Sequence, residues 1–379
     1  MQPFDMIDPT AIQEGRATDA YFLRTETTLE EAGLNPTVTL EVTADQFPTG
    51  EYEVFAGIKD VAHLLEGRPI DVDAFAEGRL FDGGPVVQIT GQYRDIARFE
   101  TSILGFLSHA SGFATRALQA RRAAPDIELF SFGARHVHPA IAPVVERSAL
   151  LAGFDGFSHV AAGDVLDREA SGTMPHALLL CFGRGKQEAA WKAFHRAVDS
   201  SVPRIALCDT FTDEVDETLR AANALGSDLD SVRIDTTSSR RGDYRAILQE
   251  VRWELDARGY EDVGLFASGG IDLMTISDLR DIVDGFGIGS FITNGAPVDF
   301  SLDIVEIDGE SIAKRGKLSG RKAVYRLPDG SNLVQRADQP APDASTPLLE
   351  PLIRDGSIVR TFDLTSAAER AREEPTLVA

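Results

Sequence analysis

The chain has 379 residues, 43% of them hydrophobic, and its 60 acidic and 37 basic residues give a formal net charge of −23. This length and apolar content predict a large core divided between two domains. The negative charge excludes a nucleic-acid-binding surface over most of the molecule. No apolar run approaches the roughly 18 residues of a membrane span, and the acidic N-terminus lacks the basic region of a secretory signal. We therefore expect a soluble, cytoplasmic protein.

The charged residues also point to the environment in which the protein works. Only 6 of the 37 basic residues are lysines, and the acidic residues are spread along the whole chain. A net charge of this size destabilises a compact fold unless salt screens it, a property that halophilic proteins exploit. The composition therefore predicts a source with a saline cytoplasm, such as a halophilic archaeon. The alternative is a protein that is merely acidic.

Residues 1–110 have the pattern of an α+β lobe rich in strands. Two-residue alternation predicts half-buried strands, and i, i+4 apolar spacing predicts helices. The stretch 71–80 is too polar to contribute to a core. The expected strands are 37–42, 51–55 and 85–90, and the expected helices are 60–65, 96–107 and 114–124.

Residues 111–296 change to an alternation of strands and helices, which predicts a parallel sheet. No GxGxxG follows the first strand, so an irregular (β/α) barrel is favoured over an open doubly wound sheet. The expected strands are 127–132, 157–160, 204–207, 231–234, 263–266 and 288–292, and the expected helices lie near 139–152, 176–199, 212–225 and 243–258.

Residues 297–379 return to two-residue alternation, in 302–307 and 323–327. We expect this C-terminal segment to pack back on the N-terminal lobe. Residues 336–347 have the composition of a linker, and 367–374 that of a polar helix or a frayed end.

Two glycine-rich turns follow the last two expected strands of the barrel. The first is Ser268-Gly269-Gly270, and the second is Gly287-Ile288-Gly289. Glycines allow sharp turns that bring backbone N–H groups close to an anion, and adjacent turns of this kind bind phosphate in many barrels. We predict a phosphate site here, against the alternative of two ordinary loops. The helix between the turns is expected to begin with a capping box of Thr275 and Asp278 and to end near Gly285.

Polar residues follow the other expected strands of the barrel, where barrel active sites lie. Arginines there bind carboxylate or phosphate, and aspartates bind Mg²⁺ or a ribose hydroxyl. The inventory suits a sugar polyphosphate ligand. Its members are Arg135, His136, His159, Asp209, Arg233 and Asp235.

Seven short stretches, taken in order, resemble the nicotinate phosphoribosyltransferases, members of the type II group that includes nicotinamide and quinolinate relatives. The stretches are FGAR, FSHVAAG, SGTMPHA, CDT, VRID, ASGG and GIGS, and the resemblance covers residues 12–327. It implies an N-terminal lobe closed by the C-terminal tail, an irregular α/β barrel, and synthesis of nicotinate mononucleotide from nicotinate and phosphoribosyl pyrophosphate (PRPP) in NAD salvage.

The resemblance also implies roles for individual residues. Phe132 would stack on the pyridine, with Arg135 near its carboxylate or the ribose phosphate. Arg233 and Asp235 would line the base and the ribose. Asp209 would lie near the pyrophosphate and Mg²⁺, as a metal ligand. The 5′-phosphate would bind at Ser268, Gly269, Gly270, Gly287 and Gly289.

Further implied features concern ATP and assembly. His176, preceded by Thr173 in GTMPH, matches the histidine that ATP phosphorylates in coupled members, so ATP is an expected co-substrate. Tyr21 in ATDAY matches a tyrosine that reaches the neighbouring subunit's pyridine, which implies a homodimer with shared active sites. His159 stands where the family often has aspartate, so the base preference at that position stays open.

Three alternatives remain at this point. A quinolinate enzyme would need more cations around its base, and a nicotinamide enzyme would need fewer. A non-catalytic phosphosugar-binding barrel would keep the glycine turns and need neither His176 nor Asp209. Zinc is not expected, because no cysteine follows Cys208 in the tail, and Cys181 and Cys208 are expected to be buried free thiols.

Overall fold

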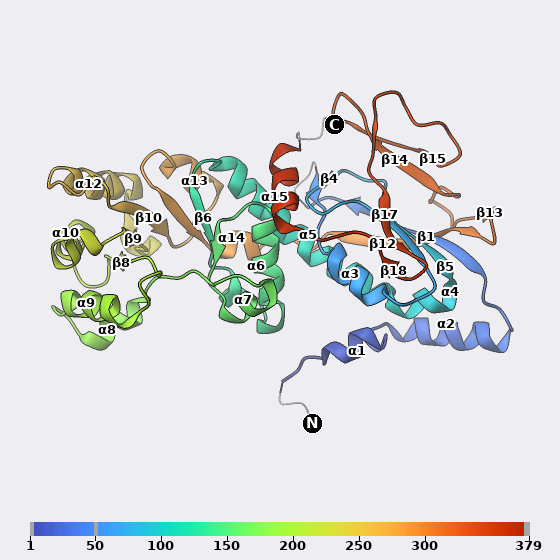
Figure 1. Ribbon diagram of the computed structural model, residues 1–379, viewed down its shortest axis with the longest axis horizontal. Helices are drawn as coiled ribbons and strands as arrows, with labels where there is room; N and C mark the ends of the chain where they lie inside the picture. The colour runs from blue at the N-terminus through green and yellow to red at the C-terminus, as the bar shows by residue number, and fades with distance from the viewer. Residues whose placement is uncertain (1–3, 49–51, 375–379) are drawn as a thin grey trace. The chain divides into compact units, whose positions relative to one another are not determined.

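A computed structural model describes residues 4–48 and 52–374 of the chain (Figure 1). The chain divides into two compact units. The first, which we call the antiparallel unit, comprises Met1–Leu118, Leu151–Gly153 and Gly295–Ala379. The second, the parallel unit, comprises Gln119–Leu150 and Phe154–Asn294.

The antiparallel unit is built on a seven-stranded sheet in which strands from both ends of the chain alternate in space. β1 (Thr37–Gln46) pairs on one side with β5 (Pro85–Gln92) and on the other with β12 (Asp299–Ile307). The remaining strands of the sheet are β3 (Asp71–Ala74), β13 (Glu310–Ser311), β17 (Glu350–Arg354) and β18 (Ser357–Ile358).

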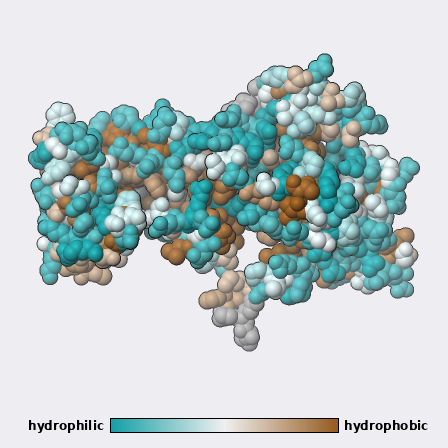
Figure 2. Space-filling view, in the orientation of Figure 1, coloured by the Kyte–Doolittle hydropathy of each residue, from teal (hydrophilic) through white to brown (hydrophobic). Residues whose placement is uncertain are grey.

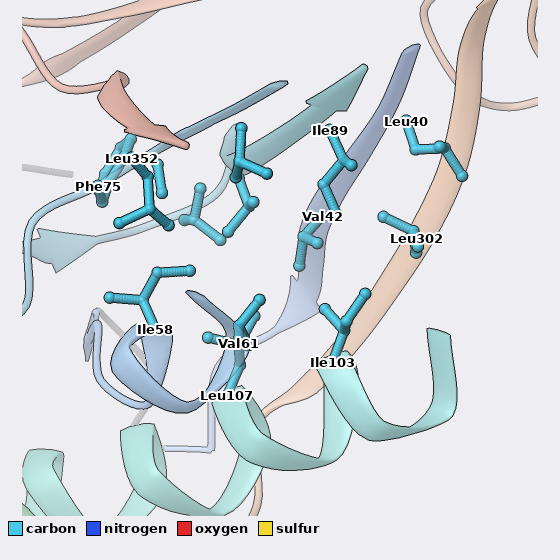
Figure 3. Close-up of a cluster of buried hydrophobic side chains, with 14 of the residues drawn as sticks. Leu40, Val42, Ile58, Val61, Phe75, Ile89, Ile103, Leu107, Leu302 and Leu352 are labelled. Atoms are coloured by element: carbon cyan, nitrogen blue, oxygen red, sulfur yellow. The ribbon is translucent and has the colours of Figure 1, made fainter. Parts of the chain in front are cut away.

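The core of this unit lies between the sheet and two helices, α3 (Ile58–Leu65) and α5 (Glu100–Ala123). Side chains of the sheet, among them Val42 and Leu302, face Val61 of α3 and Ile103 of α5 (Figure 3). Burying each such side chain contributes about 1.5–3 kcal/mol.

Shorter elements complete the antiparallel unit. They are α1 (Pro9–Gln13), α2 (Ala20–Glu31), β2 (Glu53–Val54), β4 (Leu80–Phe81), α4 (Tyr93–Ile96), β14 (Lys322–Arg326), β15 (Asn332–Arg336), β16 (Thr346–Pro347) and α15 (Leu364–Glu373).

The parallel unit contains a six-stranded sheet in the order β7-β6-β11-β10-β9-β8, and every pairing in it is parallel. One cavity is lined by residues of β6, β8, β9, β10 and β11, so the sheet curls around it. Among the described residues no strand closes the gap between β7 and β8. The predicted irregular barrel is confirmed, as an open one. Its strands are β6 (Glu128–Ser131), β7 (Gly156–Phe157), β8 (Ile205–Leu207), β9 (Ser231–Ile234), β10 (Gly264–Ser268) and β11 (Gly285–Ile288).

Helices separate these strands, as the alternation predicted. They are α6 (Ala142–Leu151), α7 (Val160–Leu166), α8 (His176–Phe182), α9 (Gln187–Ala197), α10 (Glu214–Leu225), α11 (Ser238–Arg241), α12 (Tyr244–Asp256), α13 (Leu273–Leu279) and α14 (Ser290–Thr293). The predicted helix 176–199 is two helices, because the chain turns at Gly183 and Gly185, both with positive φ.

Several element predictions for the antiparallel unit were wrong for physical reasons. Residues 71–80 hold β3, whose Val72 and Ala74 are buried while aspartates alternate with them. The predicted helices 96–107 and 114–124 are largely one helix, α5. Gly112 within it serves packing, because a Cβ there would lie 2.2 Å from the Ala296 carbonyl oxygen. Of the predicted strand 51–55, Glu51 lies outside the described residues.

In the parallel unit, the prediction missed the start of the last strand. β11 begins at Gly285 and ends at Ile288, and the next residues form α14 instead of a strand. The cap of α13 is Asp272, whose Oδ1 accepts a hydrogen bond from Thr275 N at 2.9 Å, and the helix ends at Leu279. Both cysteines are free, but Cys181 is exposed, contrary to expectation.

None of the helices in the described ranges is long and apolar enough to cross a membrane. Hydrophilic residues cover most of the face seen in Figure 2.

The surface charge leads to a test of the salt hypothesis. Because the net charge is −23, screening by KCl should relieve self-repulsion in the folded state. We expect the melting temperature to rise by on the order of 10 °C between low and molar KCl, measured by circular dichroism. A flat or falling curve would refute a halophilic adaptation.

Candidate active site

A cavity of about 500 Å³ lies in the parallel unit at the carboxyl ends of its strands. Apart from Asp209, every predicted site residue of this unit lines it. These lining residues are Phe132, Arg135, His159, Thr173, His176, Arg233, Asp235, Ser268, Gly269, Gly270, Gly287 and Gly289.

One wall of the cavity is the ring of Phe132, which follows β6. A Cβ on Gly287 of β11 would lie 2.2 Å from Phe132 Cε2, so only glycine leaves room for this ring. A Cβ on Gly289 would lie 3.0 Å from the Phe132 carbonyl oxygen. The second glycine turn therefore positions an aromatic surface in addition to opening the backbone to a ligand.

The first glycine turn forms the opposite wall, after β10. Gly269 and Gly270 have φ of +84° and +70°, a region that disfavours side chains. A Cβ on Gly269 would also lie 2.6 Å from Asp235 Oδ1. Both glycines are thus required by conformation, and Gly269 also by the carboxylate beside it.

Arg233 of β9 is a cation set deep in this wall, with its side chain 11% exposed. Its Nη2 donates to the Met174 carbonyl oxygen at 2.8 Å, and its Nη1 lies 3.6 Å from Asp235 Oδ2. Among the described residues no atom accepts a hydrogen bond from its buried Nε–H. Burial lowers the pKa of Arg233, and Asp235 and Asp209 oppose that shift.

The guanidinium of Arg233 also lies near the aromatic wall, with Cζ 6.0 Å from the centre of the Phe132 ring. A flat ligand stacked on this ring would bring its edge toward a positive charge with an unused donor. Such an arrangement suits an aromatic ring that carries a carboxylate.

His176, the first residue of α8, is paired with Asp209 behind it. His176 Nε2 lies 3.0 Å from Asp209 Oδ1, and the other oxygen, Oδ2, accepts a hydrogen bond from Asp235 N at 2.8 Å. The hydrogen bond to Asp209 raises the pKa of His176, and burial partly opposes it. Because an ionised carboxylate only accepts hydrogen bonds, Asp209 favours the proton on Nε2 and leaves Nδ1 for other chemistry.

Asp209 itself is hidden from the cavity. Its side chain is 1% exposed, whereas that of Asp235 is 25% exposed and lines the cavity wall. In the described part of the chain, no three His, Cys, Asp or Glu side chains gather as a metal site. A divalent cation here would therefore depend on ligands from a bound substrate.

Family models identify these features with a known group of enzymes. The model described as "Quinolinate phosphoribosyl transferase, N-terminal domain" matches residues 19–111, and the corresponding C-terminal domain model matches residues 113–303. The chain belongs to the type II phosphoribosyltransferase family.

Relatives of this phosphoribosyltransferase include a crystal structure titled nicotinate-nucleotide pyrophosphorylase from Pyrococcus furiosus. That structure is 46% identical, covers 98% of each chain and has a TM-score of 0.93. The nicotinate phosphoribosyltransferase pncB1 of Mycobacterium tuberculosis is 30% identical over 94% of this chain and 89% of its own. Human nicotinic acid phosphoribosyltransferase, 19% identical with a TM-score of 0.75 over 94% and 93% of the chains, shares the fold.

Arg241 of the phosphoribosyltransferase escaped the sequence analysis. Its guanidinium donates to the carbonyl oxygens of Thr236, at 2.9 Å, and of Gly269, and it lies 4.0 Å over the ring of Tyr244. It therefore holds the first glycine turn from behind. The only signal for it was the pair of arginines before Gly242, which by itself indicates a solvated turn.

Tyr21 lies in the antiparallel unit of the phosphoribosyltransferase, on α2. It is 56% exposed, so it is neither a strand residue nor a core residue of its own unit. Its ring centre lies 4.3 Å from that of Phe22, which is buried beneath it. An exposed tyrosine held by a buried neighbour is available to a ligand or another chain.

Proposed function

We propose that the protein transfers the phosphoribosyl group of PRPP to nicotinate, giving nicotinate mononucleotide and pyrophosphate. The observation that carries this choice is Arg233, whose buried Nε–H has no partner in the described part of the chain and which lies beside the Phe132 ring. One buried cation beside an aromatic wall suits a pyridine with one carboxylate. The names of the relatives from M. tuberculosis and P. furiosus support the same substrate.

Binding of PRPP follows from the rest of the cavity. The turns at Gly269 and Gly287 would receive the 5′-phosphate through backbone N–H groups. The carboxylate of Asp235 would bind the ribose hydroxyls or a Mg²⁺ ion that arrives with the pyrophosphate. This fits a metal that is usually held by one or two carboxylates and substrate phosphates, and Mg²⁺ would neutralise charge on the leaving group.

Catalysis in this scheme needs no covalent help from the protein. As the bond between C1 of the ribose and pyrophosphate breaks, positive charge develops on the ribose, and the pyridine nitrogen attacks the same carbon. Phe132 and Arg233 hold the pyridine in line, and Asp235 lies beside the developing charge. Positioning and electrostatic stabilisation of this kind supply most of the rate enhancement in such displacements.

The nearest alternative is quinolinate, because the matched family models carry that name. Quinolinate brings a second carboxylate, which needs a second cation near the base. Arg135 lines the same cavity and is the candidate for that role, although its Nε lies 3.4 Å from His136 Nε2. Nicotinamide, which has no charge, would leave Arg233 uncompensated.

Initial rates with the three pyridines test this choice. We expect the wild-type protein to prefer nicotinate, and we expect Arg233→Gln to lower kcat/KM for nicotinate by about 10- to 100-fold, the usual worth of a hydrogen bond to a charged group. The same variant should lose less with nicotinamide. A wild-type preference for quinolinate would establish the alternative.

We also propose that ATP drives the reaction through His176. In this scheme Nδ1 attacks the γ-phosphorus of ATP, ADP leaves, and the proton on Nε2 stays hydrogen-bonded to Asp209. Hydrolysis of the phosphohistidine then accompanies turnover. The supporting observation is the His176–Asp209 pair at 3.0 Å, with His176 lining the cavity.

Replacing His176 with Ala should abolish the stimulation of turnover by ATP while slow ATP-independent transfer persists. The reason is that the base and phosphate sites do not use His176. Rates with and without ATP, together with the release of ADP, measure this directly. A variant that responds to ATP as the wild type does would make His176 a structural residue.

A further inference from the structure

The loop that carries Asp209 is held from below by one buried carboxylate. Glu217 on α10 is fully buried and accepts hydrogen bonds from three successive backbone N–H groups. The donors are Thr210 at 2.9 Å, Phe211 at 2.7 Å and Thr212 at 3.0 Å. Three consecutive amides bound to one side chain leave this loop little conformational freedom.

The same carboxylate also reaches the segment that carries His176. Gln187, the first residue of α9 and itself fully buried, donates from Nε2 to Glu217 Oε1 at 3.1 Å. α9 follows α8, which begins with His176. Arg220, one turn after Glu217, donates to Gln187 Oε1 at 3.2 Å and to Glu188 Oε1 at 2.6 Å.

We propose that Glu217, which does not line the cavity, is the positioning residue for the His176–Asp209 pair. His176 is 37% exposed on its side chain, so its orientation depends on its partner. Asp209 adjoins Thr210, the first amide that Glu217 binds. Glu217 thus links the loop after β8 to the start of α9 and sets the 3.0 Å contact between them. This inference rests on the proposed role of His176.

The chemistry of these hydrogen bonds makes the carboxylate specific. A charged acceptor binds N–H donors about twice as strongly as a neutral one. Glutamine has the same size, but one of its two terminal atoms is a donor, which repels the backbone N–H groups and leaves buried donors unsatisfied. Glu217→Gln therefore changes the support of the loop and keeps the volume of the side chain.

A double-mutant cycle tests whether Glu217 acts through His176. It compares wild type, Glu217→Gln, His176→Ala and the double variant in ATP-coupled transfer at molar KCl. We expect Glu217→Gln to lower kcat by tenfold or more, as roughly a 1 Å misplacement does, while KM for nicotinate changes less than about twofold. In the His176→Ala background the same substitution should have no further effect. Equal losses in both backgrounds, or no loss in either, would overturn the proposal.

The matched control is Asp230→Asn, at the amino end of the same strand, β8. Asp230 Oδ2 also accepts a backbone hydrogen bond, from Arg204 N at 2.6 Å, but it lies away from the cavity. We expect it to lower the melting temperature without lowering kcat. If Glu217→Gln does not fold, Gln187→Met removes one of the four hydrogen bonds, and it should give a smaller loss of kcat that likewise vanishes in the His176→Ala background. A loss that persists there would overturn the proposal.

Hydrogen exchange separates failure of this inference from failure of the proposed function. Wild-type activity with nicotinate reports on the function alone. Independently of activity, Glu217→Gln should speed exchange in peptides covering 176–187 and 209–213 and leave the glycine turns at 268–270 and 287–290 unchanged. Unchanged exchange in 176–187 would show that Glu217 does not support the histidine segment.

Discussion

Gly287→Ala is expected to reduce kcat/KM for nicotinate by on the order of 100-fold. The new methyl group would lie 2.2 Å from Cε2 and 2.5 Å from Cδ2 of Phe132, far inside contact distance. Because β11 is paired on both sides, by β6 and β10, the backbone cannot move away, and the Phe132 ring must. The ring would then leave the position from which it faces Arg233.

The matched control for this variant lies two residues earlier in the same strand. A Cβ on Gly285 would lie 2.1 Å from Phe266 Cε1, so Gly285→Ala creates an equal conflict with a different ring. Phe266 does not line the 500 Å³ cavity. Both variants should lose about 1–3 kcal/mol of stability from overpacking, but Gly285→Ala should keep activity within about tenfold of wild type. Equal activity losses in the two would mean that the damage is general.

Mixed dimers should regain about a quarter of wild-type activity from two inactive variants, Tyr21→Ala and Gly269→Asp. We propose that Tyr21 stacks on the pyridine bound by the neighbouring subunit, opposite Phe132, so that each site is shared across a homodimer. Gly269→Asp inactivates the barrel of its own chain, because φ is +84° and a Cβ would lie 2.6 Å from Asp235 Oδ1.

The arithmetic of the mixture makes this prediction sharp. Random pairing after unfolding and refolding together gives about half mixed dimers, and each of these has one intact site of two. The intact site joins the barrel of the Tyr21→Ala chain to the tyrosine of the Gly269→Asp chain. No recovery, with mixed dimers confirmed by mass, would mean that Tyr21 serves its own subunit or has no role in the site.

Much of the site was predictable because its residues follow the strands directly. In a parallel sheet, strand ends meet at one edge, so Phe132, Arg233, Asp235 and the glycine turns converge whatever the length of the loops between them. The same logic failed for Asp209, which follows β8 but turns inward to bind His176. Whether a carboxylate faces a cavity or a histidine depends on contacts between distant segments, which strand periodicity does not encode.

Elements were missed where one residue type serves two purposes. Gly285 and Gly287 suggested a loop, yet they lie in a strand because Phe266 and Phe132 occupy the space above them. Gly112 suggested a helix break, yet it allows the backbone at Ala296 to pass close to α5. Glu217 carried no signal, because a lone glutamate early in an amphipathic helix usually faces solvent.

The most direct measurement is identification of the product made by the purified protein from PRPP and nicotinate in molar KCl, with and without ATP. Mass spectrometry and a pyrophosphate assay should show nicotinate mononucleotide and pyrophosphate in equal amounts, with faster formation when ATP is present. Formation of that nucleotide from quinolinate with release of carbon dioxide, and none from nicotinate, would contradict the proposed function.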